Sequence, residues 1–178
     1  MADQRITQLT ALTDPVDADL GVVVDDVAGT PITKKITLST LKDFFRKLLA
    51  IPTADTTADG LKVDLVAAEN LVFGEVCYIN SSGKLAKADA DAIATASAFF
   101  MALASISTDA TGTFLHIGFV RNDAWNWTVG GLIYLSTTAG ALTQTRPSAT
   151  DDVIQILGVA THADRMIFNP SLIQVEHV

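Results

Sequence analysis

The chain has 178 residues, of which 49% are hydrophobic and 18% are charged, and its formal net charge at pH 7 is −8. This length suits one medium-sized domain, or a small domain with an ordered extension. The acidic balance disfavours general binding to the phosphate backbone of nucleic acids. No stretch reaches the roughly 20 consecutive apolar residues that a membrane-spanning helix needs. We therefore expect neither a nucleic-acid partner nor a membrane partner.

The N-terminal part of the chain predicts a β-hairpin. Residues 20–26 and 32–37 are strand-like, and the second of them alternates apolar and polar residues as a half-buried strand does. Gly29 and Pro31 lie between the two runs and favour a turn.

One helix is predicted after the hairpin, over residues 40–50, and it ends before Pro52. Its apolar residues recur at the spacing of a single helix face: Leu41, Phe44, Phe45, Leu48 and Leu49. We interpret residues 1–52 as an attachment segment made of an arm, the hairpin and this helix. The small polar residues at 53–60 are typical of a linker.

From residue 61 onward the sequence predicts short strands. Strand-like runs, separated by turns rich in Gly, Pro and Asp, occur at 61–66, 75–80, 99–106, 113–120, 131–136, 153–160, 165–168 and 172–178. Many short strands at this spacing are typical of a sandwich or a barrel. The alanine-rich stretch 89–98 fits either a loop or a short helix.

This β region repeats itself. Residues 74–82, Gly-Glu-Val-Cys-Tyr-Ile-Asn-Ser-Ser, match residues 130–138, Gly-Gly-Leu-Ile-Tyr-Leu-Ser-Thr-Thr, and each copy runs on into a further glycine, Gly83 or Gly140. Each copy is too short to bury a core alone, so it needs its partner. We predict a mainly β fold in which residues 61–178 form a β-sandwich or small β-barrel from two related halves.

No strong catalytic or cofactor motif is found in the sequence. The patterns of phosphate loops, dinucleotide-binding turns, nucleophile elbows and HExxH zinc sites do not occur. The single cysteine, Cys77, lies in an apolar run and is expected to be buried and inert. His116 is interpreted as a histidine at the edge of the core or at an interface, and His162 is expected to pair with Asp164 or Arg165. We predict a protein that is not an enzyme and binds no cofactor or metal.

The most unusual stretch is Arg121-Asn122-Asp123-Ala124-Trp125-Asn126-Trp127. Aromatic rings beside planar polar groups can stack on a sugar or anchor a protein partner, which makes Arg121, Asn122, Asp123, Trp125 and Trp127 candidate contact residues. The alternative is packing. A spacing of two places both tryptophans on one face of a strand, where they would cap the barrel or meet a neighbouring subunit.

Two parts of the chain resemble known virion proteins. Residues 5–41, which run from Ile6-Thr7-Gln8-Leu9 through Leu20-Gly21-Val22-Val23-Val24 to Thr33-Lys34-Lys35-Ile36-Thr37, resemble the N-terminal segment of many tailed-bacteriophage fibre and virion proteins. Residues 118–127 and 130–136 are similar to small β modules of phage tail-fibre and head-decoration proteins. The resemblance implies a non-enzymatic, homotrimeric virion protein, made in the cytoplasm of a bacterial host.

The resemblance also implies partners. The N-terminal segment would attach to phage capsid or tail proteins, and the length of the chain favours a capsid decoration or head-fibre role. Apolar residues of that segment would bury against the particle or against sister subunits, namely Leu20, Val22, Val24, Phe44, Phe45 and Leu48. The alternative is a tail-fibre or adhesin component that binds host-surface glycans through Trp125 and Trp127.

Overall fold

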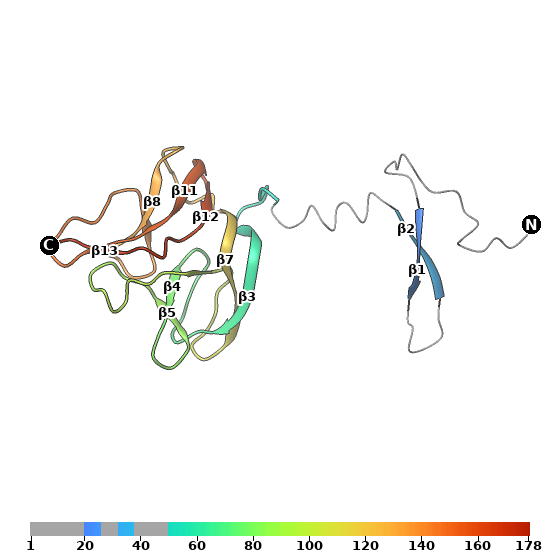
Figure 1. The fold of residues 1–178 in the computed structure, drawn as a ribbon, viewed down its shortest axis with the longest axis horizontal. Coiled ribbons are helices and arrows are strands. Elements are labelled where there is room, and N and C mark those ends of the chain that lie inside the picture. Colours follow the sequence, from blue (N-terminus) through green and yellow to red (C-terminus); the bar gives the residue numbers. More distant parts are fainter. Residues whose placement is uncertain (1–19, 26–31, 38–49) are drawn as a thin grey trace, which may run out of the picture. The chain divides into compact units, whose positions relative to one another are not determined.

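The computed structural model describes residues 20–25, 32–37 and 50–178. The chain divides into two compact units, residues 1–47 and residues 48–178. In the first unit, strands β1 (Leu20–Asp25) and β2 (Ile32–Thr37) pair antiparallel, which confirms the predicted hairpin (Figure 1). The predicted helix over residues 40–50 lies outside the described residues, except for Ala50.

The regular elements of the described part of the second unit are all strands. In chain order they are β3 (Thr57–Val66), β4 (Val76–Ile79), β5 (Leu85–Lys87), β6 (Phe100–Ala102), β7 (Thr111–Arg121), β8 (Leu132–Leu135), β9 (Leu142–Thr143), β10 (Val153–Ile154), β11 (Ile156–His162), β12 (Arg165–Phe168) and β13 (Val175–Glu176). Nine of them form one curled antiparallel sheet with the shape of a half-barrel, and β10 and β13 form a separate pair. The prediction of a mainly β fold is confirmed.

The order of strands in the large sheet shows the duplication. Along the sheet the order is β5-β4-β6-β7-β12-β11-β8-β9. When β4, β5, β6 and β7 are matched with β8, β9, β11 and β12, this order is the same from either end. The two copies therefore form two related halves, as predicted, and both halves lie in one sheet. They meet where β7 pairs with β12.

The repeat extends to single hydrogen bonds. The backbone N–H of Gly74 donates to the carbonyl oxygen of Ala102 at 2.9 Å, and that of Gly130 donates to Ala160 at 2.8 Å. Gly74 and Gly130 have φ angles of 89° and 80°, in the left-handed region that glycine adopts without strain. The sequence pattern shared by the two copies thus specifies the same turn in each of them.

Strand β7 connects the two halves. Its first part pairs with β6 and its last part with β12, while β3 runs along its other side from end to end. Gly60 of β3 lies opposite Gly118 of β7, and a Cβ atom on either glycine would come within 2.2 Å of a backbone oxygen of the facing strand. Only glycine permits this approach.

Some strands differ from the predicted ones. β5 and β9 lie in stretches that we interpreted as turns, because three and two residues are too short to show an alternating pattern. The predicted strand 153–160 is divided at Gln155, and β3 starts at Thr57 instead of residue 61. The alanine-rich stretch 89–98 contains turns and loop, without a helix.

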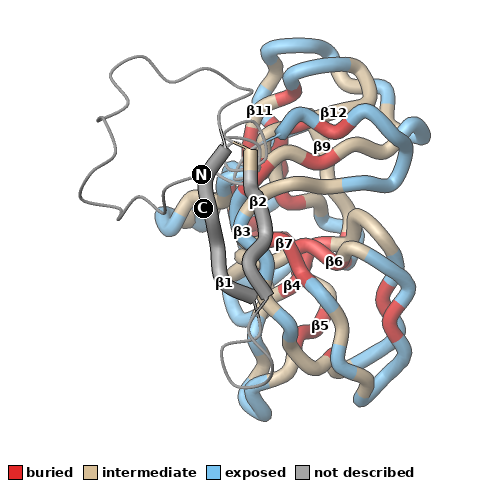
Figure 2. The backbone as a smooth tube through the Cα atoms, turned by 90° about the vertical axis from the view of Figure 1, so that its right-hand side faces the viewer, coloured by how far each residue is buried: buried red, intermediate tan, exposed pale blue. Residues whose placement is uncertain are grey.

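The larger core cluster is shared by both halves. Residues of both copies are fully buried in it, among them Val76, Met101, Leu115, Ile133, Leu157 and Phe168. A smaller cluster lies within the first half, around Leu71, Leu85 and Phe114. In Figure 2 the buried stretches accordingly run through strands of both copies.

One buried polar side chain links the halves. Gln155 is fully buried, and its Oε1 accepts the backbone N–H of Ala98 at 3.0 Å. Its Nε2 donates to the carbonyl oxygens of Ala98 at 3.2 Å and Ser171 at 2.9 Å. Because the amide oxygen and nitrogen are both paired, it can be buried without a large desolvation cost.

Candidate functional site

Two of the residues singled out at the end of β7, Arg121 and Asp123, form a polar cluster with Asp164 and residues 53–55. We call this group the Arg121 cluster. The Arg121 Nε donates to Asp123 Oδ1 at 2.6 Å, and Arg121 Nη2 lies 2.9 Å from Asp164 Oδ2. The hydrogen bond to Asp123 raises the pKa of Arg121. The guanidinium group is therefore held between two carboxylates.

The same guanidinium group also holds the chain that leads into β3. Arg121 Nη1 donates to the carbonyl oxygen of Thr53 at 3.0 Å. Two residues further along each segment, the backbone N–H of Asp123 donates to Asp55 Oδ1 at 2.7 Å. Residues 53–55 are thus fastened to the far end of β7, across 68 positions of sequence.

Asp164 lies at the centre of the cluster. Its carboxylate also contacts His162 Nδ1, and Arg165 Nε is 3.6 Å away. Burial raises the pKa of this carboxyl, but the hydrogen bond from His162 and the charge of Arg121 lower it, and the net direction is downward. The predicted pairing of His162 with Asp164 is confirmed.

Both tryptophans belong to the loop between β7 and β8. Their ring centroids are 5.5 Å apart and the rings are tilted by 47°. Each ring is partly buried and packs against the larger core cluster, and Trp127 Nε1 is buried without a hydrogen-bond partner within the described part of the chain. This arrangement favours the packing interpretation of the pair.

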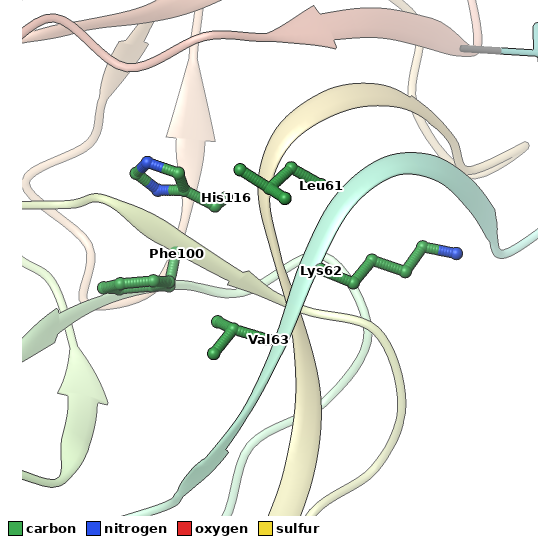
Figure 3. Close-up of a pocket in the computed structure, with 5 residues that line it drawn as sticks. All are labelled: Leu61, Lys62, Val63, Phe100 and His116. Carbon is green, nitrogen blue, oxygen red and sulfur yellow. The ribbon is translucent and has the colours of Figure 1, made fainter. Parts of the chain in front are cut away.

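A second feature is an apolar groove on the surface of β3, β6 and β7 (Figure 3). Its volume is about 360 Å³, and it is lined by Leu61, Lys62, Val63, Phe100 and His116. The side chains of Leu61, Val63, Phe100 and His116 gather on one side of β3, while Lys62 extends to the other side. Leu61 is 62% exposed, which is unusual for a leucine in the middle of a long strand.

His116 faces this groove because the register between β3 and β7 shifts beside it. Leu61 pairs with Ile117 and Lys62 pairs with Leu115, so His116 is the extra residue of a bulge. Its Nδ1 is 3.1 Å from the carbonyl oxygen of Phe99, and its ring lies 5.4 Å from that of Phe100. A position at the edge of the core is what the sequence predicted.

The remaining candidates are spread over the molecule. Cys77 is buried, and burial raises the pKa of its thiol to about 12, so the thiolate is not formed near neutral pH. Leu20, Val22 and Val24 lie in strand β1 of the hairpin. Phe44, Phe45 and Leu48 lie outside the described residues.

Sequence reasoning found Arg121 and Asp123 but missed two of their partners. Asp55 was placed in a linker, and Asp164 was considered only for His162. Neither partnership has a local signal, because Asp55 and Asp164 are brought to Arg121 by the pairing of β3 and β12 with β7.

No group of three or more His, Cys, Asp or Glu side chains within residues 20–25, 32–37 and 50–178 is arranged to hold a metal ion. Over the same residues, no helix is long and apolar enough to cross a membrane. No known protein-family model matches the sequence, and no curated protein matches it significantly.

Proposed function

We propose that this protein is a non-enzymatic structural component of a phage-type virion, a homotrimer that attaches through residues 1–52 and presents its β domain. The proposed location is the capsid, as a decoration or head-fibre protein made in the host cytoplasm. The partners would be sister subunits and a capsid protein. The resemblance of residues 5–41, 118–127 and 130–136 to such proteins motivates this proposal.

The observation that supports it is the way residues 53–55 are fastened. An attachment segment can position a domain only if the chain between them is held at the domain. Arg121 Nη1 holds the Thr53 carbonyl, and Asp55 accepts the N–H of Asp123. A pair of hydrogen bonds that involves charged groups resists displacement better than neutral ones do.

The chemistry of the domain fits this role. The charged groups of the Arg121 cluster satisfy one another, and the tryptophan rings pack on the core. In a catalytic or ligand site we would look instead for polar groups directed into an open cavity. The groove at β3 is lined mainly by apolar side chains, as a surface for protein contact is.

The proposal is tested on particles isolated from the bacterial strain that carries this sequence. We expect antibody-gold labelling to place the full chain on the capsid at regular positions. A chain lacking residues 1–47 should keep its β structure by circular dichroism and be absent from the particles. Particles without the full-length protein, or truncated protein that still joins them, would contradict the proposal.

A second candidate is glycan binding at the host surface as part of a tail fibre. It is favoured by the two tilted tryptophan rings beside the exposed Asn126 and Asp123. On a glycan array, this function requires a signal from the full chain that Trp125→Ala and Trp127→Ala both abolish. We expect no such signal, because both tryptophan side chains are partly buried against the larger core cluster.

A further inference from the structure

One face of the large sheet carries a row of apolar side chains, which we call the outer row. The row crosses four neighbouring strands, and each member is the register partner of the next: Leu132, Val159, Ile167 and Phe119. Register partners lie on the same face of a sheet. The residues that alternate with them, such as Ile133 and Met166, are fully buried in the larger core cluster. The outer row therefore faces away from that core.

The first copy has the same row at equivalent positions, and there it is fully buried. The repeated turn at Gly74 and Gly130 aligns the two copies, and the strand register then matches their rows. The counterparts of Leu132, Val159 and Ile167 are Val76, Met101 and Leu115. All three counterparts are 0% exposed and lie in the larger core cluster, which they share with residues of the second copy.

The outer row of the second copy has no such cover among the described residues. Leu132 is 41% exposed, and Phe119, Val159 and Ile167 are half-buried but belong to neither core cluster. A unit of a repeated fold buries its apolar face on a neighbour, and the last unit normally ends in a polar face. Here the last face is apolar, which marks it as an interaction surface.

The outer row lies within a larger apolar surface that has a polar border. Ile117 precedes Phe119 by two residues in β7, and its partner in β3 is Leu61; they are 38% and 62% exposed. On the other side of the row are the register partners Arg121 and Arg165. With β3 the surface spans five strands, about 19 Å at the usual strand spacing. That width suits the apolar centre of an interface that buries about 800 Å² on each partner.

The fold indicates what fits this surface. Each half of the sheet has two faces, and three of the four are already covered: both faces of the first half and the inner face of the second. In the first copy, the equivalent row is buried against an apolar sheet face. The described part of a second chain has one apolar sheet face left to offer, and that face contains its own outer row.

The charges agree with pairing between copies. The chain has a net charge of −8, so two copies repel each other, and like charges brought together at a contact cost free energy. No member of the outer row is charged. This surface is therefore one at which two acidic copies can meet without placing like charges against each other.

We propose that the outer rows of sister subunits pack on one another, so that this face is the interface between copies of the chain. Ile167 belongs to β12, the central strand of the surface, so its copies lie near the symmetry axis. The number of copies, three, comes from the proposed function, and the inference rests on that function to this extent.

The first experiment places a negative charge on the outer row of the full-length chain. Leu132→Glu changes its most exposed member, so the fold should persist, and each contact between copies gains charge repulsion. We expect the mass in light scattering at micromolar concentration to fall from three chains to one. The matched control is Ile79→Glu, because Ile79 is 53% exposed in β4 and lies outside this surface. It should leave the mass unchanged, and circular dichroism checks that both variants are folded.

A second measurement uses the proximity of identical residues at the axis. With a short bismaleimide, the full-length Ile167→Cys variant should give cross-linked pairs of chains, whereas Ile79→Cys should give none. The native Cys77 is fully buried and does not compete.

Three outcomes would overturn the interface. An oligomer that Leu132→Glu leaves intact, without the Ile167→Cys cross-link, would place the contacts elsewhere while the homotrimer stands. A native chain that is monomeric at micromolar concentration would remove both the interface and the trimer, but not the capsid location, which the gold labelling tests separately. If that monomer joined particles and Leu132→Glu prevented it, the surface would bind a particle protein instead of a second copy.

Discussion

The two copies of the repeat cap the same turn with different side chains. In the first copy, the backbone N–H of Val72 donates to Glu75 Oε2 at 2.8 Å. In the second, the equivalent N–H of Thr128 donates to Gln144 Oε1 at 2.7 Å. Glu75 is part of the turn itself, whereas Gln144 follows β9 and reaches the turn from outside.

The residues at the equivalent positions of the other copy differ in a matching way. Where the first copy has Glu75, the second has Gly131, and a Cβ atom there would lie 2.5 Å from Gln144 Nε2. Where the second copy has Gln144, the first has Lys87, whose Nζ is 2.7 Å from Glu75 Oε1. A duplicated fold thus preserves the need for a capped N–H group, and either of two positions can supply the cap.

The largest expected effect concerns how far each copy depends on the other. Gln155→Ala removes the amide donor from the carbonyl oxygens of Ala98 and Ser171, and it removes one of the two acceptors of the Ala98 N–H, which also donates to the Ala96 carbonyl oxygen. Each buried group left without a partner costs roughly 1–3 kcal/mol. We expect the free energy of unfolding in urea to fall by about 3 kcal/mol, still in one transition.

The control for this variant is Gln174→Ala, because Gln174 forms similar amide bonds at a partly buried position. It should cost about 1 kcal/mol. Two separate unfolding transitions in Gln155→Ala would mean that the copies are independent domains, against the shared core described above.

An intermediate effect is expected from exchanging the caps. Gly131→Glu displaces the Gln144 amide from Thr128 and should destabilise the protein by about 2 kcal/mol in urea unfolding. Adding Gln144→Lys recreates the pair of the first copy, so the double variant should recover more than half of that loss.

The coupling energy between the two substitutions measures the exchange directly. Gln144→Lys alone is the matched single variant, and it should also be destabilising because it removes the cap from Thr128. If the two single losses simply add in the double variant, the copies are not interchangeable at this turn.

The smallest effect is a pH dependence at the place where the two copies meet, because Arg121 of β7 is paired with Asp164 beside β12. The pKa of Asp164 is lower in the folded protein than in the unfolded chain. Ionised Asp164 therefore stabilises the fold at pH values above its unfolded-state pKa of about 4. That contribution is lost as pH falls through the folded-state pKa. We expect the Arg121 cluster to loosen below about pH 4, seen as a change in tryptophan fluorescence before global unfolding.

In Asp164→Asn the fluorescence change should be absent, because no carboxylate remains to titrate at that position. An unchanged acid transition in this variant would assign the effect to another carboxylate, such as Asp123.

The sequence predicted the class of fold because its signals were local. Residues close together in the sequence indicate the hairpin, the alternating strands and the repeated pattern of the two copies. The repeated turn also requires a glycine in each copy, at Gly74 and Gly130. The order of strands followed from none of these. It is set by β7, which pairs with β3, β6 and β12 at positions far apart in the chain.

The candidate site was predicted in part for the same reason. Arg121 and the tryptophans stood out by composition, and His162 by its neighbours. Asp55 was taken for a polar linker residue, because nothing near it in the sequence reveals that its carboxylate meets the N–H of Asp123. Likewise the sequence predicted a strand-like run at 172–178 but did not reveal that Leu172 and Ile173 are exposed.

The contact between Gly60 and Gly118 has a consequence for how this sequence can change. Each glycine leaves the space that the opposite backbone occupies, so enlarging one cannot be compensated by shrinking the other, which already has no side chain. Most paired positions in a sheet can drift together through a series of matched substitutions. This pair has no such path: in a saturation library it would stay fixed at both sites, while positions 131 and 144 could change together as a matched pair.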